Sequence, residues 1–102
     1  MNLPSCTPPD PDASRPVTAC TAFGTCNNAH EPTFTVRQGI DSEDALVCAV
    51  AALKAAYETN AIALEKAVDP MRSLLAATEN SLEKGLALTE AVLQGIECRA
   101  LK

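Results

Sequence analysis

Apolar and small residues recur at alternating steps of three and four between Glu43 and Lys102. The first series contains Leu46, Val50, Leu53, Tyr57, Leu64, Ala67 and Val68. The second series contains Met71, Leu75, Thr78, Leu82, Gly85, Leu86, Val92 and Ile96. This period is typical of the stripe by which a helix packs, and the intervening residues include many alanines, which have the highest helix propensity. The pattern therefore predicts two amphipathic helices, at about residues 42–67 and 71–99.

Asp69 and Pro70 interrupt the helical pattern. Proline removes a backbone donor and disfavours the α conformation of the residue before it. An Asp at the N-cap followed by Pro at the first helical position is also a favoured helix start. We therefore predict an antiparallel two-helix hairpin that turns at residues 68–70. The alternative is a single helix that is kinked at Pro70.

The register of such a hairpin follows from the position of its turn. If the chain reverses near residue 69, residues whose numbers sum to about 138 face each other. Leu53 then opposes Gly85, which has no side chain and so leaves room for the large leucine. Asn60 opposes Thr78 within the stripe, and a polar pair at this point would fix the register.

The second predicted helix carries more apolar surface than one partner helix covers. The surplus consists of Leu74, Leu86, Leu88 and Leu93. We predict that two hairpins associate through these leucines into a homodimeric four-helix bundle. Two alternatives are a different protein as partner and coverage of the surplus by the N-terminal segment.

The N-terminal part of the chain has no helical or strand period. Residues 1–32 hold six of the seven prolines, separated mainly by small and polar residues, which predicts a disordered tail. Phe34 and Val36 lie on one face of an extended segment at residues 33–40, and Gly39 permits a turn. We expect this segment to dock over the open end of the hairpin. Its alternative role is a peptide strand for the sheet edge of a partner.

The length and charge of the chain exclude several classes of protein. A chain of 102 residues holds one domain at most. Its net charge of −5 and lack of a basic cluster argue against nucleic-acid binding. We find no uninterrupted apolar run of membrane-spanning length and no signal peptide, which predicts no membrane interaction and a cytoplasmic location.

Five cysteines without an export signal are expected to be reduced thiols. Three of them lie in the predicted tail together with the only histidine, and as a set they could be imagined as metal ligands: Cys6, Cys20, Cys26 and His30. Structural zinc sites usually contain closely spaced ligand pairs on a tight turn, and no such pair is present. We therefore predict no metal and no cofactor, and keep a thiol or metal sensor as an alternative function.

The predicted helices offer no catalytic constellation. Their acidic residues, together with Arg72 and Lys84, are expected to form a solvated outer face: Glu79, Glu83, Glu90 and Glu97. A carboxylate metal site in a bundle would need inward histidines, and neither helix contains one. Because there is also no Gly-rich phosphate loop, we predict that the protein is not an enzyme and has no catalytic residues.

The segment Phe34-Thr35-Val36-Arg37-Gln38-Gly39-Ile40, followed by Glu43-Asp44-Ala45-Leu46, resembles the opening of a family of short bacterial proteins. That family is classed as a domain of unknown function. The resemblance covers about residues 33–100 and departs at Val47-Cys48-Ala49, where a small polar residue is expected. It implies a small bacterial, cytoplasmic, helical protein, and it brings no activity, catalytic residue or cofactor.

Together these observations predict an all-α, non-enzymatic interaction module that self-associates, with a regulatory or adaptor-like role. The first alternative is a subunit of a heteromeric complex, such as an antitoxin, an immunity protein or a small chaperone. The second alternative is the sensor based on the N-terminal cysteines.

Overall fold

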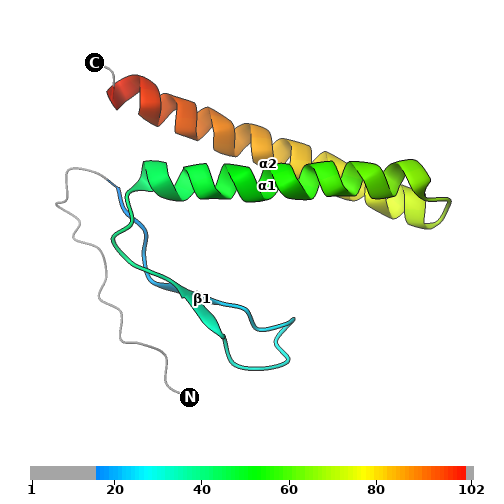
Figure 1. Ribbon diagram of the computed structural model, residues 1–102, viewed down its shortest axis with the longest axis horizontal. Helices are drawn as coiled ribbons and strands as arrows, with labels where there is room; N and C mark the ends of the chain where they lie inside the picture. The colour runs from blue at the N-terminus through cyan, green and yellow to red at the C-terminus, as the bar shows by residue number, and fades with distance from the viewer. Residues whose placement is uncertain (1–15, 101–102) are drawn as a thin grey trace. The chain divides into compact units, whose positions relative to one another are not determined.

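The computed structural model describes residues 16–100 of the chain. In chain order the elements are β1 (Thr21–Phe23), β2 (Phe34–Val36), α1 (Ser42–Lys66) and α2 (Met71–Ala100) (Figure 1). The described residues divide into two compact units, with the boundary between Ala45 and Leu46.

The N-terminal unit contains a two-stranded antiparallel sheet, which the sequence pattern did not predict. Phe23 pairs with Phe34 in the register of β1 and β2, and their rings stack with centroids 5.5 Å apart. The prediction of a disordered tail is therefore wrong for residues 16–32, which include β1. Residues 1–15, the remainder of that predicted tail, lie outside the described residues. The extended segment at residues 33–40 is also not a lone docking strand, because its β2 residues pair with β1.

The loop between β1 and β2 uses left-handed backbone. Gly24 has a φ of +86°, and Cys26, Asn27 and Asn28 follow with φ values of 51°, 58° and 67°. The carbonyl of Thr25 accepts hydrogen bonds from the amides of Ala29 and His30, at 2.9 and 3.2 Å. Asparagine tolerates this conformation better than most residues, which explains the Asn pair in the turn.

Thr18 ties the strand-like segment before β1 to the turn that precedes α1. Its hydroxyl donates to the carbonyl of Arg37 at 2.6 Å and accepts from the amide of Ile40 at 3.0 Å. The amide of Gly39, whose φ is +86°, donates to the Thr18 carbonyl at 2.9 Å. These bonds pair residues that the sequence pattern had treated as tail and docking segment.

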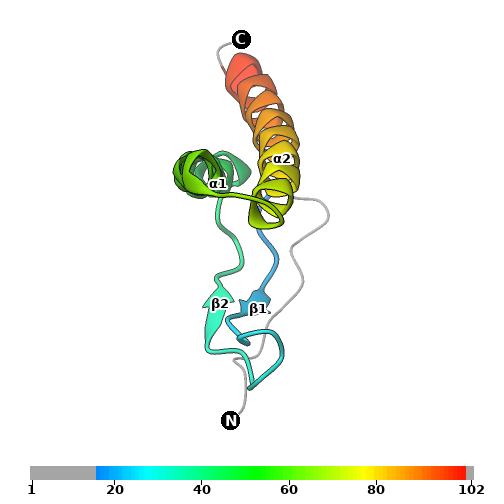
Figure 2. The same cartoon turned by 90° about the vertical axis from the view of Figure 1, so that its right-hand side faces the viewer.

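The predicted helical hairpin is confirmed. Helices α1 and α2 match the predicted bounds to within one residue at each end, and the chain reverses between Lys66 and Met71. Figures 1 and 2 show the two helices lying next to each other and running in opposite directions. The alternative of one helix kinked at Pro70 is therefore wrong.

Two side chains close the turn of the hairpin. Asp69 Oδ1 accepts hydrogen bonds from the backbone amide and the hydroxyl of Ser73, at 3.2 and 2.7 Å, and so caps the start of α2. Arg72 Nη1 donates to the carbonyl of Leu64 at 3.0 Å, in the last turns of α1. Arg72 is exposed, as the sequence predicts, and its guanidinium also satisfies a carbonyl near the negative end of α1.

The contact between the helices follows a strict seven-residue repeat. On α1 the positions toward α2 are Leu46, Val50, Leu53, Tyr57, Asn60, Leu64 and Ala67. On α2 the half-buried positions at this spacing are Leu75, Glu79, Leu82, Leu86, Thr89, Leu93 and Ile96, and the adjacent Gly85 and Glu90 are half-buried as well. We call these two rows the seam, and their alternating spacing of four and three is that of a coiled coil.

The seam differs from the predicted stripe on α2 in one respect. Met71, Thr78 and Val92 were expected to face α1, but all three are exposed. The residues that follow them, Arg72, Glu79 and Leu93, lie on the side of α2 nearer to α1. Glu79 and Leu93 are half-buried there, and Arg72 bonds to the Leu64 carbonyl. The sequence pattern favoured the row of Met71, Thr78 and Val92 because it contains no charged residue. The row that lies nearer α1 contains two charged residues, Arg72 and the half-buried Glu79.

Asn60 is the only residue classed as buried in the described part of the chain, with 9% of its surface exposed. Its Nδ2 donates to the backbone carbonyl of Leu75 at 3.0 Å. The predicted side-chain pair with Thr78 is wrong, because the Thr78 hydroxyl donates to the carbonyl of Leu74. Leu75 lies within one turn of Thr78, so Asn60 still meets α2 at about the predicted height.

The two left-handed glycines of the N-terminal unit make a matched pair for a first prediction. Gly24→Ala should disrupt the sheet more than Gly39→Ala, since a Cβ at Gly24 would lie 2.8 Å from Phe34 Cδ2, whereas a Cβ at Gly39 would meet nothing within 4 Å. Gly39→Ala should cost only the left-handed backbone penalty of about 1–2 kcal/mol. Nuclear Overhauser contacts between the Phe23 and Phe34 rings measure the effect. If both variants lose these ring contacts to the same extent, the close approach of Gly24 to Phe34 is contradicted.

The cap of α2 supports a second prediction. Asp69→Ala should lower the free energy of unfolding by about 1 kcal/mol, because the amide and hydroxyl of Ser73 lose their acceptor. Asp69→Asn keeps an acceptor oxygen and should retain most of the stability. Urea unfolding followed by circular dichroism at 222 nm measures both variants, and an unchanged midpoint for Asp69→Ala would show that this oxygen contributes nothing.

Candidate protein-interaction surface

The described part of the chain contains no hydrophobic residue classed as buried. Several large apolar side chains of the hairpin are more than half exposed, including Leu88 at 69%, Leu74 at 62%, Met71 at 56% and Val92 at 55%. Folded domains gain most of their stability by removing such side chains from water. The hairpin taken alone therefore leaves much of its apolar surface in contact with solvent.

Met71, Leu74, Leu88 and Val92 lie beside one flank of the seam, whereas the other exposed large apolar side chains of the hairpin, Val47, Ile62 and Val68, lie elsewhere. On α1 this flank consists of small residues, Ala49, Ala52, Ala56, Thr59 and Ala63. On α2 it consists of Met71, Leu74, Thr78, Ser81, Gly85, Leu88 and Val92. In an antiparallel pair of helices the corresponding flanks lie on the same side. Together these residues form what we call the uncharged face, since none of them carries a charge.

The opposite flank of the seam is charged. On α1 it holds Lys54, Glu58 and Glu65 among the uncharged Val47, Ala51 and Ala61, and on α2 Glu83, Glu90 and Glu97 follow one another at steps of seven. We call this the acidic face. Carboxylates in such a row are stable in water and costly to bury without partners. The hairpin thus has one face suited to contact with protein and one suited to solvent.

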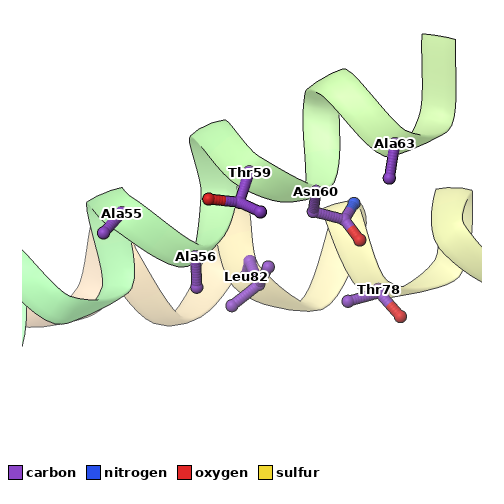
Figure 3. A pocket seen from close by; sticks show the side chains of 7 residues that line it. All are labelled: Ala55, Ala56, Thr59, Asn60, Ala63, Thr78 and Leu82. Carbon is purple, nitrogen blue, oxygen red and sulfur yellow. The ribbon is translucent and has the colours of Figure 1, made fainter. Parts of the chain in front are cut away.

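A groove runs over the uncharged face between the helices. It has a volume of about 580 Å³ and is lined by Ala55, Ala56, Thr59, Asn60, Ala63, Thr78 and Leu82. Figure 3 shows that Ala56 and Ala63 of α1 and Thr78 of α2 point to the same side of the hairpin. The groove exists because four of the five lining residues from α1 are alanine or threonine, too small to fill the space beside α2.

The four leucines predicted to form an interface divide into two pairs. Leu74 and Leu88 are exposed on the uncharged face. Leu86 and Leu93 are half-buried in the seam, where they face α1. The sequence pattern identified all four leucines as more apolar surface than one stripe needs. It could not decide which of them face α1, because adjacent rows of residues on α2 are both apolar in part.

The candidate metal ligands of the N-terminal part that the structure describes are Cys20, Cys26 and His30, and they do not form a group. Cys20 forms a disulfide, which corrects the expectation of reduced thiols for this residue. Cys26 is an exposed free thiol, and His30 Nδ1 lies 2.6 Å from the carbonyl oxygen of Glu31. Cys6 lies outside the described residues. Within residues 16–100 no three His, Cys, Asp or Glu side chains are grouped so that they could hold a metal ion.

Helix α1 is long and apolar enough to cross a membrane by length and composition alone. A helix with a wide apolar face in a soluble protein passes the same test. Lys54, Glu58 and the hydrogen-bonded Asn60 lie in its central turns, and charged side chains are costly inside a bilayer. The absence of a membrane interaction therefore stays a prediction.

Comparison of the chain with protein-family models, curated proteins and solved structures finds no match. The resemblance to a bacterial family of unknown function accordingly stays a prediction.

The division of the leucines gives a third prediction. The double variant Leu86→Glu plus Leu93→Glu should lose most of its helical signal in circular dichroism, because two charges would enter the seam of the hairpin itself. Glu83→Gln plus Glu97→Gln, on the exposed acidic face of the same helix, should keep that signal. Full helicity in the leucine variant would contradict the placement of both side chains against α1.

Proposed function

We propose that this protein is a non-enzymatic helical interaction module that self-associates through its hairpin. The observation that carries the proposal is the absence of a buried hydrophobic residue in the described chain, together with the exposed apolar row on α2. Ordering two long helices costs conformational entropy along their whole length, and apolar burial is the main term that offsets it. Association supplies the burial that one hairpin lacks.

The role that fits such a module is regulatory or adaptor-like. A different protein could cover the same face, and the chain would then be a subunit of a heteromeric complex. The sensor alternative gains no support from residues 16–100, where the candidate ligands are not grouped. The cytoplasmic location that the sequence predicts stays a prediction.

Light scattering of the full chain at micromolar concentrations, with and without reductant, tests self-association. The expected mass is twice the 10.7 kDa of one chain, independent of reductant. The matched control replaces the three exposed free thiols by serine, at Cys26, Cys48 and Cys98, and should give the same mass.

A monomer under all these conditions would refute the proposal and direct attention to a heteromeric partner. A dimer that disappears with reductant or with the serine replacements would assign association to the thiols instead of the hairpin.

A further inference from the structure

We infer that the uncharged face binds the same face of a second copy, about a two-fold axis that runs parallel to the helices. The inference rests on the proposed self-association and specifies its geometry. The product is a four-helix bundle in which every neighbouring pair of helices is antiparallel.

The distribution of charge selects this face for contact with a second copy. Glu83, Glu90 and Glu97 repeat along the acidic face of α2. A two-fold contact through that face would remove the acidic rows of both copies from water. A contact through the uncharged face leaves the acidic rows of both copies in water.

The sizes of the side chains on the α1 and α2 rows of the uncharged face favour one direction of the two-fold axis. The α1 row of the uncharged face is made of alanine and threonine, whereas the α2 row presents Met71, Leu74, Leu88 and Val92. A two-fold axis parallel to the helices places the large α2 row of each copy over the small α1 row of the other. An axis across the helices would stack large on large and small on small, and so would leave gaps.

The same symmetry fixes the register. Rotation about an axis parallel to the helices does not change the height of a residue, so each residue lies level with its counterpart in the second copy. Within one chain Asn60 is level with the Leu75 turn. Leu74 should therefore lie over Ala63 of the second copy, and Leu88 over Ala49 and Ala52. Thr59, Asn60 and Thr78 of both copies would share one polar layer.

The size of the face matches what a stable dimer requires. Helix α1 has 25 residues, which corresponds to roughly 38 Å at about 1.5 Å per residue. Two helices side by side, each about 10 Å wide, give a footprint of roughly 750 Å². A standard stable interface buries about 800 Å² on each partner.

Two variants test the face by different means. Leu88→Glu places a charge on the α2 row, and Ala56→Trp fills the groove without adding charge. Each should raise the dissociation constant of the dimer by roughly a hundredfold or more, because a buried unpaired charge or an overfilled groove opposes docking. The controls are Ala87→Glu and Ala51→Trp, at exposed positions away from the uncharged face, which should leave the mass unchanged.

A mixing experiment tests the partner and the register. Leu88→Glu and Ala52→Lys chains should each be monomeric alone, and an equimolar mixture should recover the dimer mass and the helical signal, because the glutamate of one chain then meets the lysine of the other. Recovery supports the inference even if either variant is unfolded by itself.

The outcomes separate the two proposals. A dimeric wild type whose mass survives both Leu88→Glu and Ala56→Trp would overturn the face and leave self-association standing. A mixture that stays monomeric would overturn the axis and its register. A monomeric wild type would refute the proposed function itself, and the inference with it.

Discussion

Two helices in contact have no interior, and this constraint governs the hairpin unit. Each helix can cover only one stripe of the other, so the seam residues from Leu46 to Ile96 are half-buried at best, apart from Asn60. The leucines that would fill the core of a larger protein are divided between the seam and the exposed row beside it. Because apolar burial is the main force that opposes conformational entropy, this exposed surface is the physical basis of the proposed self-association.

The polar contacts of the hairpin specify geometry where the apolar contacts are permissive. The amide of Asn60 is bonded to the Leu75 carbonyl in the middle of the seam, and Arg72 reaches the Leu64 carbonyl beside the turn. A sliding of one helix by a turn would break both bonds and leave a buried amide without its acceptor, whereas leucines and alanines could repack at small cost. These two side chains therefore define the register of α1 against α2.

The N-terminal unit has a different basis of order. Its strands contain three residues each, and a two-stranded sheet of this size is marginal in water. Backbone pairing is supplemented by the Thr18 hydroxyl and by the stacked rings of Phe23 and Phe34. These local contacts order the unit, whose described residues include no buried hydrophobic side chain.

The sequence by itself determined the helices and the turn, because helix period, alanine content and the Asp69-Pro70 pair act locally. It also located the surplus of leucines on α2. It could not determine the pairing of residues 17–41, since a strand of three residues leaves no period and its partner lies a dozen residues away. Nor could it decide which of two adjacent rows on α2 faces α1, because both are apolar in part. Only the tertiary structure decided that choice, by the hydrogen bonds of Asn60 and Arg72 that fix how α2 is rotated, and with it which leucines stay exposed.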